Sequence, residues 1–188
     1  MPIIELHILV GYSEADKTRL GEALTDAVRT VVPAPPEAVT VMIHEMPRTS
    51  YMRGRVHRTA APAQPSQIEV VRRFLAAMEN RDLATARSLL GAGFTMTFPG
   101  NTRMHSLEEL IAWAGPRYRF VTKTYEGFDV MQSADAHAVV HCRGTLSGEW
   151  PDGTPFTGIR FIDRFEVTGG LLTRQDVWND ISEHKGKT

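Results

Sequence analysis

A short segment rich in proline and alanine, residues 59–66, most constrains how this chain of 188 residues can fold. Its composition is typical of a linker and favours neither a helix nor a strand. We therefore expect two domains, residues 1–58 and 67–188, each with its own core. A domain of about sixty residues hides only about 60% of its unfolded-chain surface, so we expect the first to form a homo-oligomer, a dimer or larger.

The bulk composition narrows the class of protein. The formal net charge of −1 provides no overall attraction to nucleic acid or to an anionic membrane. No stretch approaches the roughly 20 apolar residues that span a bilayer, and the first residues lack the basic region of a secretory signal, so we expect a cytoplasmic protein. The single cysteine, Cys142, excludes an intrachain disulfide and a cysteine-based zinc site. Its strand-like surroundings favour a buried, inert thiol over a nucleophile.

The first domain has the pattern strand, helix, strand. Apolar residues alternate with other residues over 4–10 and again over 39–44, which is the period of a strand. Between these runs, Ser13 and Asp16 resemble a capping box, and apolar residues follow at helical spacing up to a cluster of prolines. Two strands joined by such a helix should lie parallel, with a right-handed crossover.

Pro2 is the residue of this domain with the clearest chemical role. Bacterial methionine aminopeptidases normally remove Met1 when a small residue follows, proline included, and the product carries a free secondary amine. An ordinary α-amine has a pKa of about 7.7–8.0, and apolar surroundings disfavour its charged form further. A base that titrates near the working pH suits proton transfer at a carbon beside a carbonyl. The competing interpretation is a proline start that reflects processing alone.

The order of these features resembles the 4-oxalocrotonate tautomerase family from Pro2 to about Gly54: the proline, the first strand with its terminal glycine, the helix and the second strand. The resemblance implies a β-α-β protomer that shares its sites with other protomers, commonly in a hexamer, and an isomerase that converts enols of 2-oxo acids to ketones through the proline. Tyr12 and Thr40 occupy positions where the typical enzyme has substrate-binding arginines. Neither side chain can form the two charge-assisted hydrogen bonds that an arginine makes with a carboxylate. We therefore expect a substrate other than the usual dicarboxylate.

Further substrate-binding candidates of this domain follow the second strand. Tyr51 falls where the family places an aromatic residue that packs beside the proline. The resemblance therefore implies an apolar surface, without water, next to the amine. Arg48, Arg53 and Arg55 are candidates for the missing positive charge, and Arg53 is favoured because it follows Tyr51 closely. A solvated basic tail or a contact between protomers is the alternative for each arginine.

Two histidines lie in the predicted strands, His7 in the first and His44 at the end of the second. We interpret both as core or interface residues. Without a cysteine or a cluster of carboxylates beside them, they indicate no metal ligand set, and nothing in the chain points to a cofactor.

The second domain begins with helices and ends with strands. Ser66 and Glu69, and later Ser106 and Glu109, form capping boxes at two helix starts, and another helix lies between them. A short strand is predicted at 94–98, and four longer strands follow, separated by turn signals such as Gly169-Gly170. Their ranges are 119–128, 136–146, 156–167 and 171–181. This order indicates an α+β domain with an antiparallel sheet.

That order resembles the SnoaL-like branch of the cone-shaped NTF2-like superfamily, with residues 94–100 and the hairpin at 165–172 as its most specific parts. The superfamily includes isomerases, polyketide cyclases, epoxide hydrolases and non-catalytic ligand binders. The base of ketosteroid isomerase has no counterpart, because Phe98 precedes Pro99. Asp176 lies where epoxide hydrolases and some cyclases have an acidic residue, which makes it the catalytic candidate. A salt bridge at the end of a strand or a dimer contact is the alternative.

Other residues of this domain are candidates for lining a pocket. Among polar side chains these are His105, His141 and Asp163. Four aromatic residues either form a pocket wall or belong to the hydrophobic core: Trp113, Tyr118, Phe120 and Trp178.

Two functional hypotheses follow. The first is an enzyme, a proline-based tautomerase of a small enolisable carbonyl compound, in which the second domain provides specificity or a second step. The second is a binding protein for a small hydrophobic ligand, non-catalytic or cyclase-like, oligomerised by a degenerate tautomerase module. The absent arginines favour the second hypothesis, whereas Pro2 together with Tyr51 favours the first.

Overall fold

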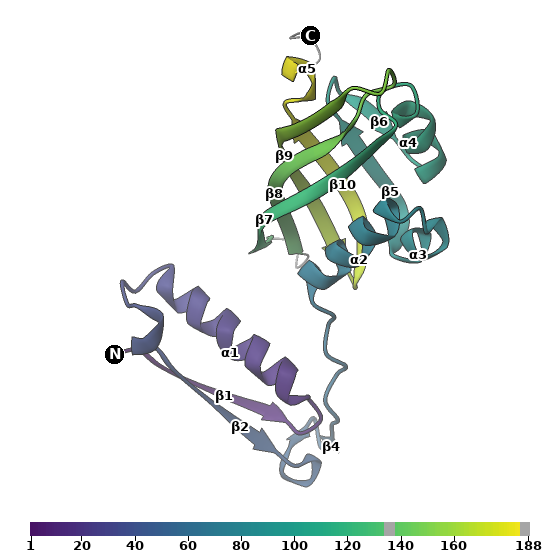
Figure 1. Cartoon of the computed structure of the whole chain (residues 1–188). Coiled ribbons are helices and arrows are strands. Elements are labelled where there is room, and N and C mark those ends of the chain that lie inside the picture. Colours follow the sequence, from purple (N-terminus) through teal and green to yellow (C-terminus); the bar gives the residue numbers. More distant parts are fainter. Residues whose placement is uncertain (134–137, 185–188) are drawn as a thin grey trace. The chain divides into compact units, whose positions relative to one another are not determined.

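The computed structural model describes residues 1–133 and 138–184. The chain divides into two compact units, Met1–Ala63 and Gln64–Thr188 (Figure 1). The division falls inside the proline-rich segment 59–66. In the described residues, no helix is long and apolar enough to cross a membrane.

The first unit is a β-α-β structure, as the alternation of its residues predicts. Strand β1 (Ile3–Leu9) leads through helix α1 (Glu14–Arg29) to strand β2 (Thr40–Met46), and the two strands pair in parallel with His7 opposite His44. A short helix, η1 (Pro36–Ala38), precedes β2. After β2 come a second short helix, η2 (Arg48–Ser50), and a small hairpin of strands β3 (Met52–Arg53) and β4 (Val56–His57).

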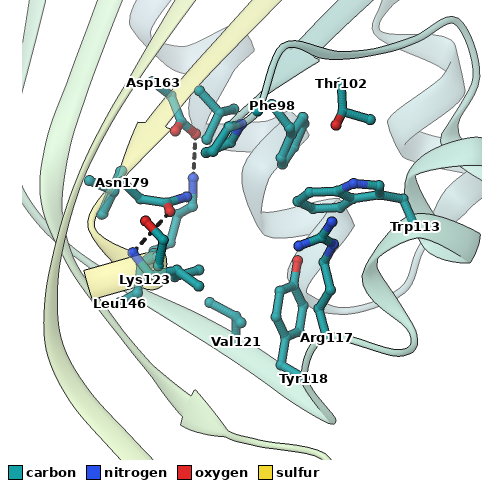
Figure 2. A pocket seen from close by; sticks show the side chains of 16 residues that line it. Phe98, Thr102, Trp113, Arg117, Tyr118, Val121, Lys123, Leu146, Asp163 and Asn179 are labelled. Atoms are coloured by element: carbon teal, nitrogen blue, oxygen red, sulfur yellow. Dashed lines mark hydrogen bonds and ion pairs between the residues drawn. The ribbon is translucent and has the colours of Figure 1, made fainter. Parts of the chain in front are cut away.

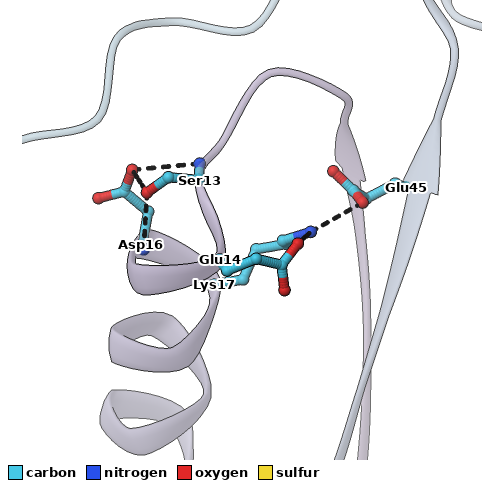
Figure 3. Close-up of polar contacts among 5 residues, drawn as sticks. All are labelled: Ser13, Glu14, Asp16, Lys17 and Glu45. Carbon is cyan, nitrogen blue, oxygen red and sulfur yellow. Dashed lines mark hydrogen bonds and ion pairs between the residues drawn. The ribbon is translucent and has the colours of Figure 1, made fainter.

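Polar contacts near the first turn of helix α1 cap its start and connect it to the sheet (Figure 3). The capping box predicted from Ser13 and Asp16 is confirmed, because each side chain bonds the backbone of the other residue. The hydrogen bond from Ser13 lowers the pKa of the Asp16 carboxyl. Lys17 lies 2.6 Å from Glu14 and 3.0 Å from Glu45, and thereby joins the helix to β2.

This unit has almost no interior of its own. Within Met1–Ala63, all of which the structure describes, no residue is fully buried. The sheet face turned away from α1 exposes apolar side chains, with Ile3 at 56% and Met42 at 37% of their full accessibility. Because burial of apolar surface is the main favourable term in folding, a lone copy of this unit gains little stability.

The second unit starts with the expected helices, α2 (Gln67–Glu79), α3 (Leu83–Ser88) and α4 (Leu107–Ala114). The side chains of Ser66 and Ser106 accept hydrogen bonds from the backbone N–H groups of Glu69 and Glu109, as their spacing predicts. A further short helix, α5 (Ile181–His184), follows the last strand.

Six strands form one sheet in the order β6-β5-β10-β9-β8-β7, and the long strands lie side by side in Figure 1. Their bounds are β5 (Leu90–Phe98), β6 (Thr102–Met104), β7 (Phe120–Gln132), β8 (Ala138–Glu149), β9 (Pro155–Thr168) and β10 (Leu171–Asn179). The expected strand at 136–146 begins in residues outside the described ones. The four closing strands pair antiparallel, as predicted, whereas β5 joins the sheet by pairing in parallel with β10.

The core lies between this sheet and the helices. Phe165 of β9 packs edge-on against Phe74 of α2, at a centroid distance of 6.0 Å, and the ring of Phe94 of β5 lies 6.3 Å from that of Phe74. Cys142 is fully buried, and burial raises the pKa of its thiol to about 12. The inert thiol expected from the sequence therefore has a physical basis, since the thiolate is the nucleophile.

Candidate functional sites

Pro2 lies at the amino end of β1 and is partly buried. Its carbonyl oxygen accepts a hydrogen bond of 3.0 Å from the N–H of Thr40, which fixes the residue against the start of β2. Met1, which must be removed to free the proline nitrogen, is 87% exposed. Pro2 and Thr40 therefore form one end of the unit.

The other candidates of this unit lie at the opposite end of the sheet. Tyr12, Tyr51 and Arg53 line an open groove of about 540 Å³ beside the carboxyl ends of the strands. Arg48 is exposed in η2, and its carbonyl oxygen lies 3.1 Å from Nδ1 of His57. Because the seven residues of β1 span about 3.3 Å each, the groove is roughly 20 Å from Pro2 within one protomer.

A cluster of metal-ligating groups that was not predicted from the sequence lies on the exposed sheet face. His7 and His44 stack with their ring centroids 4.8 Å apart. Ligand atoms of Glu5, His7 and His44 all lie within 4.8 Å of one another. The parallel register explains the cluster, because Glu5 and His7 share a face and His44 is opposite His7. Two imidazoles and a carboxylate can hold a divalent transition metal.

The second unit contains a cavity of about 610 Å³, within the usual range for small-molecule sites (Figure 2). Aromatic side chains form much of its wall, including Phe98, Trp113, Tyr118 and Phe161. Phe98 and Trp113 meet edge-on at 5.0 Å. Burial raises the pKa of the Tyr118 phenol, so its hydroxyl is protonated at neutral pH. The cavity is therefore suited to a planar apolar ligand.

A buried ion pair lies in the wall of this cavity. Lys123 of β7 contacts Oδ2 of Asp163 on β9, and Gln175 donates to the same oxygen at 3.4 Å. Asp163 is completely buried, whereas the Lys123 side chain remains 21% exposed. The ammonium of Lys123 is also 4.4 Å from the centre of the Phe161 ring. Asp163 thus lies behind Lys123 and fixes the position of its ammonium group.

The remaining candidates of the second unit lie outside this cavity lining. Asp176 is 5% exposed and forms ion pairs with Arg164 at 3.3 Å and with Arg174 at 2.9 Å, contacts like those of the competing salt-bridge interpretation. Trp178 is 53% exposed, so its ring faces away from the core. His105 is exposed and His141 is partly buried on β8, and neither lines the cavity.

Three residues that line the cavity were not predicted from the sequence: Arg117, Lys123 and Asn179. Arg117 follows helix α4, and its guanidinium stacks 4.0 Å from the Trp113 ring. Lys123 was not predicted because a lysine in a strand is usually on the solvent-exposed face. Its place in the alternation of β7, between the inward-facing Val121 and Tyr125, and its pairing with Asp163, 40 residues further along the chain, show that it faces inward.

Taken together, the folds and sites define an α+β protein that joins a β-α-β module to a curved sheet around a ligand-sized cavity. Residues 2–59 match the sequence family described as tautomerase enzyme, and residues 71–175 match the SnoaL-like domain family. The chain therefore belongs to the tautomerase family through its first unit and to the SnoaL-like family through its second.

Relatives of the first unit are found in streptococci. A Streptococcus thermophilus protein named "Probable tautomerase str1128" is 37% identical over 51 residues, which cover 27% of this chain and 84% of that protein. A Streptococcus mutans protein named "Probable tautomerase" is 35% identical over 51 residues, with the same coverage of each chain. These matches support an isomerase activity in the first unit.

Solved structures resemble the second unit. An NTF2-like protein of unknown function from Burkholderia pseudomallei aligns with a TM-score of 0.52 and 17% identity, over 62% of this chain and 92% of that one. TerC, co-crystallised with polyporic acid, aligns with a TM-score of 0.52 and 19% identity, over 63% and 95% of the two chains. At these identities the similarity establishes the NTF2-like fold alone.

Proposed function

We propose that the first unit catalyses the keto–enol tautomerisation of an enolisable carbonyl compound resembling a 2-oxo acid, with the Pro2 amine as general base after removal of Met1. The observation that carries this proposal is the position of Pro2 at the start of β1, bonded to Thr40, in a unit similar to tautomerases. The second unit provides specificity or a second step.

The proposed reaction moves one proton. The unprotonated Pro2 amine accepts the hydroxyl proton of the enol, and the electron pair of that O–H bond stays on the oxygen of the resulting enolate. As an oxygen electron pair forms the carbonyl, the electrons of the carbon–carbon double bond take the proton from the prolinium to form the new C–H bond, and the amine is restored. Such a base works best with a pKa near the working pH, which a secondary amine in apolar surroundings has.

We further propose that the complete site forms between protomers. Pro2 and Thr40 are at one end of the unit, whereas Tyr12, Tyr51 and Arg53 line the groove at the other. A symmetric assembly of copies can bring these two ends together and also cover the exposed face around Ile3 and Met42. Arg53 then supplies the positive charge that Tyr12 and Thr40 lack.

The test of the base uses the full chain and phenylpyruvate. We expect intact mass to show loss of Met1, and wild type to accelerate ketonisation of phenylpyruvate enol. In Pro2→Ala the second residue is still small, so Met1 should again be removed. The variant should nevertheless show no acceleration. Arg160→Gln, an exposed site in the second unit, is the matched control and should keep it. Retention of Met1 in the active protein would exclude the proline mechanism.

The test of the shared site mixes two variants. Pro2→Ala and Arg53→Gln should each be poorly active alone. In assemblies formed by co-expression of both variants, about a quarter of the sites should combine an intact Pro2 with an intact Arg53 from different chains, and activity should return to that extent. No gain over the separate variants would show that both residues act within one protomer or that Arg53 takes no part.

The second candidate function is ligand binding without turnover, by a SnoaL-like unit oligomerised through an inactive tautomerase module. The tyrosine and threonine at positions 12 and 40 favour it, as does the cavity of the second unit. Loss of Met1 without any ketonisation would support this alternative. For an activity located in the second unit, Asp176→Asn tests the role of the acidic residue, since unchanged turnover would remove Asp176 from the site.

A further inference from the structure

The cavity of the second unit has an uneven distribution of charge. Of the side chains that line it, Arg117 and Lys123 are cationic and Asp163 is anionic. Lys123 and Asp163 neutralise each other through their ion pair. Arg117 forms no ion pair with any residue that the structure describes, and its guanidinium stacks on the Trp113 ring. The cavity therefore has one uncompensated positive charge.

The two cations lie on different sides of the cavity. Figure 2 shows Lys123 with Asp163 on one side and Arg117 across from them, next to Trp113 and Tyr118. Arg117 is exposed, so its guanidinium lies at the mouth. Lys123 is mostly covered and lies deeper. A ligand that reaches from the mouth to the interior therefore meets a free cation first and a neutralised cation last.

The deeper cation still has hydrogen-bonding capacity. A lysine ammonium has three N–H donors, and Lys123 makes one recorded hydrogen bond, to Asp163. Because Asp163 neutralises its charge, the ammonium is better matched by a neutral acceptor such as a carbonyl oxygen than by a second anion. Arg117 has no such counter-charge, and its planar guanidinium suits a carboxylate.

We propose that this cavity binds a planar aromatic monoanion that has a carboxylate at one end and a carbonyl oxygen at the other. The carboxylate pairs with Arg117 at the mouth, the aromatic body lies among Phe98, Trp113 and Tyr118, and the carbonyl accepts a hydrogen bond from Lys123. Asp163 is a positioning residue, completely buried, that fixes the lysine. The inference does not depend on Pro2, because every lining residue belongs to the second unit.

The test uses a matched set of naphthalene probes and isothermal titration calorimetry on the full chain. The probe 6-acetyl-2-naphthoate has both groups, 6-ethyl-2-naphthoate lacks the carbonyl, and 2-acetonaphthone lacks the carboxylate. For wild type we expect 6-acetyl-2-naphthoate to bind about tenfold more tightly than 6-ethyl-2-naphthoate, the effect of one hydrogen bond to a charged donor. Equal affinities, or no binding of 6-acetyl-2-naphthoate, would overturn the proposal.

Two arginine variants test whether Arg117 binds the carboxylate at the mouth of the cavity. Arg117→Gln should weaken both carboxylated probes by about fivefold, the effect of a partly solvated ion pair, and should leave 2-acetonaphthone unchanged. The control Arg119→Gln removes a charge two residues away, which pairs with Glu149 outside the cavity lining, and should change none of the affinities. An equal effect of Arg117→Gln on all three probes, or none on the carboxylated ones, would refute the assigned role of Arg117.

Discussion

The buried ion pair of the second unit leads to an asymmetric prediction about stability. Lys123→Met leaves the Asp163 carboxylate charged and completely buried, with Gln175 as its one recorded partner. Removal of one member of a buried pair typically costs about 3–5 kcal/mol. Asp163→Asn should cost less, about 1–2 kcal/mol, because Lys123 is 21% exposed and its ammonium can reach water. Lys123→Met should therefore be the more damaging change.

The double variant separates loss of the ion pair from simple loss of packing. In Lys123→Met with Asp163→Asn no buried charge remains, and the amide can still accept from Gln175. We expect the double variant to be more stable than Lys123→Met alone, with a coupling energy of about 2 kcal/mol between the two sites. Arg160→Gln, which breaks an exposed pair of 2.7 Å with Asp180, should change stability by less than about 0.5 kcal/mol.

Urea unfolding followed by tryptophan fluorescence suits this measurement. All three tryptophans of the chain, Trp113, Trp150 and Trp178, belong to the second unit, so the signal reports that unit alone. The reasoning is refuted if Asp163→Asn destabilises the unit more than Lys123→Met does, or if the two single effects are additive in the double variant.

Three other changes have defined outcomes. Burial raises the Cys142 pKa to about 12, so iodoacetamide at pH 8 should alkylate the native chain far more slowly than the urea-unfolded chain. Because that pKa is raised from 9.0, the thiol's contribution to stability is complete below pH 9 and is lost as the pH rises towards 12, and Cys142→Ala should flatten this part of a stability–pH profile. A Cβ at Gly144 would overlap the carbonyl oxygen of Thr124, so Gly144→Ala should sharply lower the urea midpoint by tryptophan fluorescence. A methyl group added at Gly21 in α1 would meet no atom within 4 Å, so Gly21→Ala should stabilise the first unit by about 0.5–1 kcal/mol in thermal unfolding by circular dichroism.

Local features of the fold could be predicted from the sequence because their causes are local. Ser13 with Asp16 and Ser66 with Glu69 marked helix starts, since a capping side chain bonds a backbone group within three residues. The parallel pairing of β1 and β2 followed from the helix between them. Each prediction needed only one stretch of chain.

The cavity could not be predicted in the same way. Strand β10 pairs in parallel with β5, about 80 residues earlier, and no local pattern specifies such a partner. Because the cavity wall combines residues from separate strands and helices, the sequence alone did not show that Lys123 faces Asp163. Asp163, one of three polar residues predicted to line a pocket, does line the cavity, whereas Asp176, the predicted catalytic residue, pairs with two arginines outside it.

The proposed chemistry of the first unit depends on a free Pro2 amine. Its sharpest test starts from full chain purified with Met1 retained and treats it with methionine aminopeptidase. Intact mass and phenylpyruvate ketonisation are followed in the same samples. We predict that activity rises in proportion to the fraction of chains that have lost Met1, and that Pro2→Ala processed in parallel stays inactive. Full activity before Met1 is removed, or processed wild type that is no faster than Pro2→Ala, would contradict the role of the proline.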